Sequence, residues 1–396
     1  MGAQRGSPPV ADTERLMTRG VVHIVGARPN FMKAAPVIRA LRERGVAQRL
    51  IHTGQHYDAS LSDIFFGELG LPAPDLNLGV GSGSHAEQTA AIMVALEKAL
   101  TDDRPALLVV YGDVNSTMAA TLVAAKLLIP VAHVEAGLRS FDDTMPEEIN
   151  RRVTDLLSQL LFVTAPEGAD NLRAAGVSEA RIHVVGNPMI DTLLANLPAM
   201  DPDQARAHFG LDGRHAVVTI HRPANVDSSE GAGRIAEMLT GLAGLLDVVL
   251  PLHPRGRRSL ENAGLRSDEH LRVVEPLGYL DFMSLVRGAS LVVTDSGGIQ
   301  EETTVLRIPC LTVRRNTERP ITITRGTNRL VEPEDVVPIA RAILEGTWSA
   351  PAQLPPLWDG HAGERIAVVI GRWLERRTDA DADARSEIRR ASVAEA

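Results

Sequence analysis

The chain contains only one cysteine, Cys310, among its 396 residues. A single cysteine can form neither a disulfide within the chain nor a Cys-x-x-Cys metal site, so folds that depend on either are excluded. Because Cys310 lies in the apolar run RIPCLTV, we expect a buried side chain that behaves as a small hydrophobe.

Long apolar runs are also missing. No apolar stretch reaches the ~18 residues of a membrane-spanning helix, and residues 1–20 lack the apolar core of a signal peptide. These absences predict a cytoplasmic protein that does not enter membranes. The formal net charge of -9 argues against non-specific nucleic-acid binding, although a local cationic site could still hold phosphate.

Several ligand-binding motifs are absent as well. The sequence has no G-x-G-x-x-G string and no Walker A loop with its lysine, so neither a dinucleotide fingerprint nor an ATPase loop is supported. It also has no H-x-H or H-E-x-x-H pair, and the remaining histidines show no metal spacing. The sequence therefore predicts no metal site.

What the chain does contain is a regular alternation of short β-branched runs with helical patterns such as 86–99 and 116–128. Apolar strands that alternate with helices form parallel sheets covered on both faces, so we predict an α/β fold. The expected strands are 21–25, 49–52, 107–111, 130–134, 160–163, 182–185, 216–220, 248–252, 271–274, 291–294 and 310–313.

A hydrophilic segment at 198–214 separates these strands into two series. We therefore predict two Rossmann-like domains, at 20–187 and 188–359, and assign a last helix at about 360–376 to the first of them. Residues 1–19 read as a flexible lead-in, and residues 377–396 as a charged flexible tail without an apolar stripe.

Polar, glycine-rich strings follow the expected strands of both series. GARPNFMK, TGQHYD, GDVNST and EAGLRSFDDTMPEEINRR follow strands of the first series, and HRPANVD, HPRGR and DSGGIQEE follow strands of the second. Ligands of open parallel sheets bind beyond the carboxyl ends of the strands. Two domains that both carry such loops predict one ligand in a cleft between them.

The DSGG string is the clearest candidate for a phosphate site. Ser296, Gly297 and Gly298 would open a helix directly after a strand, where free N–H groups and the helix dipole bind anions. The alternative is a glycine turn with a purely structural role. A diphosphate site is favoured by the cationic residues at other strand ends, namely Arg28, Lys33, Arg222, His253 and Arg255.

Three carboxylates lie on strand-end loops of the first series. Each has a structural interpretation: Asp113 as a helix cap, Glu135 as the partner of Arg139, and Glu147 as an acid at a helix start. Because all three should face the anion site, we favour acid–base chemistry, and their crowding should raise at least one pKa. His221, at the end of another strand, is a further candidate, although hydrogen bonding alone would explain it.

Taken together, these strings resemble the non-hydrolysing UDP-N-acetylglucosamine 2-epimerases. The resemblance runs through GARPNFMKAAP, TGQHYD, YGDVNST, HVEAGLRSFDDTMPEEINR, GNPMIDTL, HRPANVD and TDSGGIQEETTVLRIPCLTVRRNTERPITITRGTN, and covers about residues 20–376. It implies a glycosyltransferase-B-like pair of Rossmann-like domains with the active site in the interdomain cleft. It also implies a homodimer.

The resemblance further implies a mechanism. A carboxylate abstracts the C2 proton while UDP leaves C1 by anti elimination, and UDP then adds back to the glycal with a proton delivered to the other face of C2. No cofactor is implied. The matching catalytic positions are Asp113, Glu135, Glu147 and His221. The matching substrate-binding positions are Arg28, Lys33, His253, Phe282 for uracil, Ser296, Gly297 and Gly298 for the diphosphate, Glu302 for ribose, and Arg319.

The chain departs from the family pattern in two places. Many members have His-Arg-Arg-Glu where residues 221–224 read His-Arg-Pro-Ala. Bacterial members can also require UDP-N-acetylglucosamine at a second, activating site, which Gln55, Arg222 and His253 would fit. Asp58 stands where that site has a glutamine, and the string GVGSGSH lacks its arginine. These departures put allosteric activation in doubt.

Three alternatives stay open from sequence. The first is a 2-epimerase of another nucleotide sugar, such as UDP-2,3-diacetamido-2,3-dideoxy-glucuronate, whose C6 carboxylate would need a cation such as Arg139, Arg151 or Arg314. The second is a hydrolysing epimerase that releases UDP and N-acetylmannosamine. The third is a glycosyltransferase on the same architecture, which has no use for carboxylates on both faces of C2.

Overall fold

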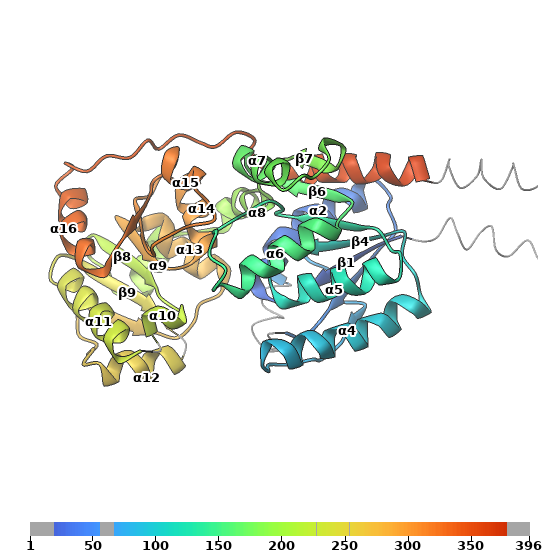
Figure 1. Cartoon of the computed structure of the whole chain (residues 1–396). Helices are drawn as coiled ribbons and strands as arrows, with labels where there is room; N and C mark the ends of the chain where they lie inside the picture. Colours follow the sequence, from blue (N-terminus) through green and yellow to red (C-terminus); the bar gives the residue numbers. More distant parts are fainter. Residues whose placement is uncertain (1–19, 56–66, 227, 253, 378–396) are drawn as a thin grey trace, which may run out of the picture.

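The computed structural model describes residues 20–55, 67–226, 228–252 and 254–377. The predicted lead-in at 1–19 and all but the first residue of the predicted tail lie outside these ranges. Two parallel sheets, each with helices on both faces, form the two halves of the molecule (Figure 1). The predicted α/β fold with two parallel sheets is therefore confirmed.

The first sheet has seven strands in the order β3-β2-β1-β4-β5-β6-β7. Its central strands are buried at every position and rich in valine, leucine and isoleucine, as expected for strands covered on both faces. Their bounds are β1 Val21–Val25, β2 Gln48–His52, β3 Leu76–Asn77, β4 Leu107–Tyr111, β5 Val131–Val134, β6 Leu160–Val163 and β7 Ile182–Val184.

The second sheet has six strands in the order β10-β9-β8-β11-β12-β13, again all parallel. The strand order of each sheet reverses at its centre, and this is the point where α/β sheets bind ligands. The bounds are β8 His215–Thr219, β9 Asp247–Pro251, β10 Leu271–Val274, β11 Leu291–Thr294, β12 Cys310–Val313 and β13 Asn328–Val331.

All the predicted strands exist, with ends that differ by at most one residue. The two strands that sequence missed, β3 and β13, lie at sheet edges. Edge strands are buried on fewer sides, so their residues need not form an apolar run. The two exposed residues of β3 and the polar Asn328-Arg329 pair of β13 illustrate this.

Proline begins many of the connecting helices, because its fixed backbone angle suits the first turn and its missing N–H is not needed there. Helices of the first half are α2 Arg28–Glu43, α4 His85–Asp102, α5 Asn115–Lys126, α6 Pro146–Leu157, α7 Pro166–Ala174 and α8 Pro188–Asn196. Those of the second are α9 Pro202–His208, α10 Pro223–Val226, α11 Ser229–Ala243, α12 Pro254–Asn262, α13 Tyr279–Gly288, α14 Gly297–Leu306, α15 Ile321–Thr324 and α16 Pro333–Leu344.

The chain crosses between the halves twice, and the last helix, at 362–377, returns to the first half (Figure 1). The buried carboxylate of Asp191 in α8 caps this helix, accepting hydrogen bonds from the backbone N–H groups of Ala362 and Gly363 at 3.1 and 2.7 Å. The two crossings touch: a Cβ on Gly186 would lie 2.1 Å from the carbonyl oxygen of Leu357. The domain limits themselves stay predictions.

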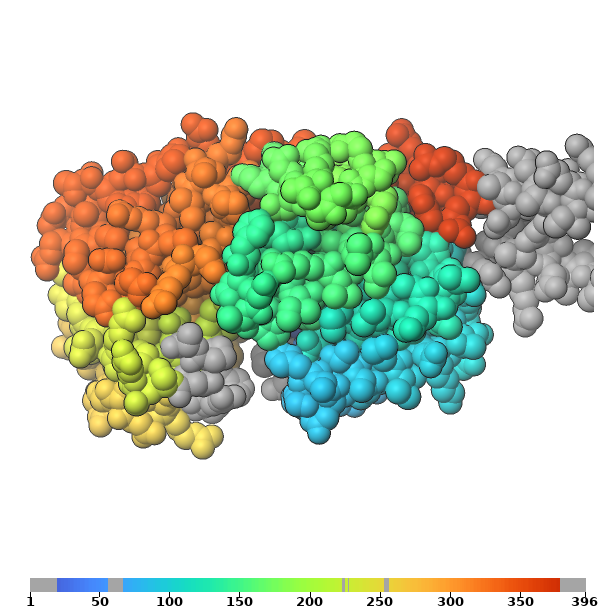
Figure 2. Space-filling view, in the orientation of Figure 1, coloured from blue at the N-terminus to red at the C-terminus, as the bar shows by residue number. Residues whose placement is uncertain are grey.

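One apolar cluster joins the two halves. It contains Leu107 and Phe162 from the first sheet together with Val217 and Val292 from the second. Figure 2 shows the halves in contact along the upper part of this face and hollowed between them lower down. Among the described residues, no helix combines the length and apolar character needed to cross a bilayer.

Candidate active site

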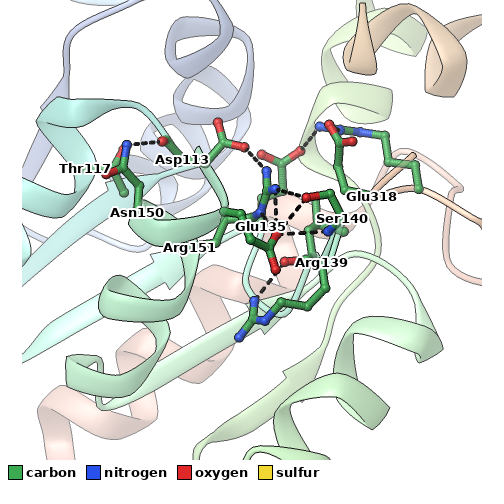
Figure 3. Close-up of polar contacts among 12 residues, drawn as sticks. Asp113, Thr117, Glu135, Arg139, Ser140, Asn150, Arg151 and Glu318 are labelled. Atoms are coloured by element: carbon green, nitrogen blue, oxygen red, sulfur yellow. Dashed lines mark hydrogen bonds and ion pairs between the residues drawn. The ribbon is translucent and has the colours of Figure 1, made fainter. Parts of the chain in front are cut away.

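Glu135 lies where the two halves meet, directly after β5 (Figure 3). Its backbone φ is 76°, in the left-handed region that non-glycine residues seldom adopt and that is concentrated at functional sites. The side chain is 2 % exposed. Gly112 packs against it, since a Cβ there would lie 3.1 Å from the Glu135 Oε2 atom and 3.0 Å from the Lys33 Nζ atom.

Two cations hold Glu135, one from each half. Lys33 of α2 binds its Oε2 atom, and the Nη2 atom of Arg319 lies 2.9 Å from its Oε1 atom. Burial alone would raise the pKa of Glu135, but the charges of Lys33 and Arg319 lower it below the ordinary value. The predicted structural role of Glu135 as the partner of Arg139 is wrong, because Arg139 pairs with Asp155 at 2.7 Å.

Helix α6 holds Asp113, which follows β4, by both its backbone and its side chain (Figure 3). The Nδ2 atom of Asn150 donates to the Asp113 carbonyl oxygen at 2.8 Å, and the Nη1 atom of Arg151 binds the Asp113 carboxylate at 2.6 Å. The other end of the guanidinium binds Glu148 at 2.7 Å. The helix-cap interpretation of Asp113 is wrong, because Val114 occupies the N-cap of α5.

Glu147 and His221 are more exposed than Glu135. Glu147 is exposed in the first turn of α6, and its charge acts across the cleft on Arg222. The Nδ1 atom of His221 lies 2.8 Å from the Oδ1 atom of buried Asp295, while the ring is 64 % exposed. Asp295 also accepts from the backbone N–H groups of His221 and Arg222, and this fixes the loop and the histidine ring together.

The predicted helix start after β11 exists. Ser296 is the N-cap of α14, and Gly297 and Gly298 form its first turn. A Cβ on Gly297 would lie 2.5 Å from the Nη1 atom of Arg319, and one on Gly298 would lie 2.9 Å from Met189 Cε. A side chain at either position would displace Arg319 or Met189, and the helix N-terminus that the glycines form can bind an anion.

Arg319 is surrounded by three carboxylates. Besides Glu135, it binds Glu318 at 2.7 Å and Glu301 at 3.1 Å. Sequence missed Glu301 and Glu318, because the strings QEE and TER contain several polar residues and their spacing does not show which point inward. Burial raises the pKa of Glu301, and the nearby charge of Glu135 raises it further.

The expected rise in pKa falls on a different pair of acids from the predicted three. Asp113 and Glu135 have separate cations, whereas Glu301 and Glu302 are adjacent on α14 and both have a raised pKa. Burial raises the pKa of Glu302 to about 7. The prediction that crowding among Asp113, Glu135 and Glu147 raises a pKa is therefore wrong, because the three carboxylates have different neighbours.

Glu302, predicted to bind ribose, is contacted by a residue that sequence did not single out. The Tyr279 hydroxyl donates to Glu302 at 3.0 Å, and Phe282 is half-buried one turn further along α13. The charge of Glu302 also acts on Arg28 at the start of α2. The predicted His253 lies outside the described residues, as does Asp58.

The chain is similar in sequence to known nucleotide-sugar 2-epimerases. A family model described as UDP-N-acetylglucosamine 2-epimerase matches residues 39–371. A Methanocaldococcus jannaschii protein named UDP-N-acetylglucosamine 2-epimerase is 41% identical over 361 residues, which cover 88% of this chain and 97% of that protein. A Pseudomonas aeruginosa protein named UDP-2,3-diacetamido-2,3-dideoxy-D-glucuronate 2-epimerase is 39% identical over 360 residues, 89% of this chain and 99% of that protein.

Solved structures agree. The crystal structure of the Methanocaldococcus jannaschii UDP-GlcNAc 2-epimerase in complex with UDP-GlcNAc and UDP matches with a TM-score of 0.82 at 39% identity, covering 89% of this chain and 99% of that one. The wall teichoic acid polymerase TagF matches with a TM-score of 0.52 at 13% identity, covering 92% and 91% of the two chains, and this likeness shows the fold alone.

The arrangement around Arg151 predicts a difference between two neighbouring arginines. Arg151→Gln leaves the carboxylates of Asp113 and Glu148 without their shared cation, and we expect a loss of about 3–5 kcal/mol in the free energy of unfolding. The control is Arg152→Gln. Its side chain is 45 % exposed and also binds Glu148 at 3.1 Å, but Glu148 keeps Arg151 in this variant, so the change should cost less than about 1 kcal/mol. Urea unfolding measures both, and equal losses would show that burial of the Arg151 pairs does not matter.

Proposed function

Because this chain belongs to the UDP-N-acetylglucosamine 2-epimerase family, we propose that it is a non-hydrolysing epimerase that interconverts UDP-N-acetylglucosamine and UDP-N-acetylmannosamine. The observation that supports this most strongly is Glu135, an ionised carboxylate held between Lys33 and Arg319 at the junction of the halves. A second carboxylate, Asp113, follows the adjacent strand, and the N-terminus of α14 in the other half packs against the Arg319 that binds Glu135.

In the proposed reaction, a carboxylate takes the C2 proton while the bond between C1 and the diphosphate oxygen breaks. The electrons of the C2–H bond form the C1–C2 double bond, and UDP leaves with those of the C1–O bond. Re-addition of UDP to C1, with a proton delivered to the opposite face of C2, gives the epimer. The sequence of steps is redox-neutral, so it requires no hydride carrier.

The hydrogen on C2, the carbon that carries the acetamido group, is not acidic. Departure of the diphosphate therefore has to drive its removal. The site must therefore stabilise charge on the leaving group and hold the base at C2 at the same time. Ser296 to Gly298 supply the helix N-terminus for the first task, with His221 nearby. Asp113 and Glu135, each fixed by its own arginine, are proposed for the second.

The relative that acts on a uronate sugar makes that substrate the main competing proposal. A uronate would need a cation for its C6 carboxylate. Two of the three predicted candidates are already engaged, since Arg139 pairs with Asp155 and Arg151 with both Asp113 and Glu148. Of the three candidates, Arg314 is left, so a uronate substrate would depend on that residue at C6.

A homodimer is proposed from the family resemblance and from exposed apolar side chains on α4 and α6, both of which pack against α5. Val94 of α4 is 73 % exposed, and Ile149 and Leu156, seven residues apart on α6, are 52 % and 69 % exposed. This spacing places the last two on one helix face. The cytoplasmic location stays a prediction.

The proposed reaction predicts deuterium incorporation. Incubation with UDP-N-acetylglucosamine in deuterium oxide, without added cofactor, should give the manno epimer with deuterium at C2 and UDP still attached. Proton NMR follows the reaction. Asp113→Asn and Glu135→Gln should each abolish turnover while leaving UDP binding measurable, because both act at C2.

Other outcomes of this experiment are informative. Free N-acetylmannosamine with UDP released would replace the proposal by the hydrolysing reaction. No exchange with this substrate, but exchange with the diacetamido uronate, would move the substrate to that sugar. Wild-type turnover in either carboxylate variant would remove that residue from the mechanism.

Glu302 predicts a pH dependence of nucleoside binding. With a pKa raised to about 7, it is largely protonated below pH 7, whereas the ionised form can accept both ribose hydroxyls. Ligand that prefers the ionised form binds more weakly as the pH falls, by up to about tenfold per unit below 7. Calorimetry with uridine, which carries no phosphate, measures this. The control ligand 2′,3′-dideoxyuridine should show no such dependence, and a parallel dependence would contradict the ribose-binding role.

The dimer proposal predicts a change in mass. Light scattering after gel filtration should give twice the chain mass of 42.6 kDa for the wild type. Leu156→Asp, which places a charge on the exposed face of α6, should shift the protein toward monomer. A wild-type monomer at micromolar concentration would contradict the proposal.

A further inference from the structure

Three cations of the site, Lys33, Arg319 and Arg28, already interact with carboxylates. Lys33 binds Glu135, and Arg319 binds Glu135, Glu301 and Glu318. Arg28 is close enough to Glu302 for the charge of that acid to act on it. A departing diphosphate needs positive charge that is not already neutralised. These residues alone therefore provide too little positive charge at the anion site.

Arg314, which follows β12, has donors to spare. Its side chain is 4 % exposed, and its Nη2 atom donates to Glu318 at 2.7 Å. Its Nε and Nη1 atoms are buried and have no hydrogen-bond partner among the described residues. Leaving a buried donor without an acceptor is unfavourable, so this side chain is suited to an acceptor that the described residues do not supply.

Arg314 is next to the N-terminus of α14. Strands β11 and β12 pair Thr294 with Thr312, and Ser296 and Arg314 each follow two residues later, beyond the carboxyl ends of these neighbouring strands. Glu318, which binds Arg314, would lie 3.0 Å from a Cβ on Gly297. The orphan donors therefore belong to the same corner of the sheet as the predicted phosphate turn.

A second guanidinium flanks this turn on its other side. Arg222 follows β8, and its Nε atom donates to the carbonyl oxygen of Asp295 at 3.0 Å. Arg222 and Arg314 are close enough that the charge of Arg314, in addition to burial, lowers the pKa of Arg222. Two cations on either side of a helix N-terminus repel each other until an anion binds between them.

We propose that Arg314 binds the diphosphate of the nucleotide sugar, together with Arg222 and the first turn of α14. The assignment rests on the proposed function and extends it. Arg314 has two unpartnered donors, at Nε and Nη1, on different edges of its guanidinium, and they can donate to separate oxygens of a diphosphate. The same oxyanion chemistry would suit a C6 carboxylate, but the position beside α14 assigns Arg314 to the diphosphate.

The test compares Arg314→Gln with Arg315→Gln, which removes an equal charge from a side chain that is 89 % exposed. Calorimetric titration uses two probes, UDP and uridine. We expect Arg314→Gln to weaken UDP binding at least tenfold and to leave uridine binding within twofold of the wild type. Arg315→Gln should leave both within twofold. Unchanged UDP binding in Arg314→Gln would overturn the proposal, whichever sugar the enzyme uses.

A purely indirect role through Glu318 is distinguishable. If Arg314 acted only by holding Glu318, Arg314→Gln would not weaken UDP binding further in a Glu318→Gln background, whereas direct binding predicts a further loss of at least fivefold. Should Arg314→Gln fail to bind uridine, Arg314→Lys replaces it. Lysine keeps the charge but offers one nitrogen in place of two separate donors, which should weaken UDP binding at least fivefold. A wild-type protein that binds UDP but exchanges no C2 proton would contradict the proposed function and leave this test readable.

Discussion

The contact of Glu135 with Lys33 and Arg319 is the interaction on which the site depends, because its three members come from three separate elements of the two halves. An ionised carboxylate buried to 2 % exposure is tolerated only with its charges paired. The pairing cannot form unless α2, the end of β5 and the loop after β12 are all in place. The proposed base is therefore kept ionised only when the two halves are packed correctly.

Around that contact, the structure supports each functional group from the backbone outward. Helix α6 holds the Asp113 loop through Asn150 and Arg151, and buried Asp295 holds the loop that bears His221. Glu318 connects Arg314 to Arg319. In each case a buried ion pair or hydrogen bond fixes a side chain that follows a strand, so the loops carry function without carrying much freedom.

Sequence predicted the architecture well because parallel strands that are buried on both faces have to be apolar throughout, and β1 and β4 show this directly. It also located Ser296 to Gly298 correctly at the start of a helix. It could not predict the partners. Glu135 was paired with Arg139, four residues away, but the left-handed backbone at Glu135 turns the side chain toward Lys33 and Arg319. Distant partners are set by tertiary packing, and a single sequence contains no local signal for them. The inward orientation of Glu301, next to Glu302, was missed for the same reason.

The second half is joined to the first at both of its ends, and the two joining segments touch where Gly186 meets Leu357. A body held by one flexible link can turn and slide in many directions, but a body held by two links that lie against each other is left chiefly with rotation about the line through them. If the halves move apart, we therefore expect them to rotate about this one axis. Such a rotation would separate Arg319 from Glu135 and move the turn at Ser296 away from the first sheet at the same time. The parts of the site would then come together or separate simultaneously.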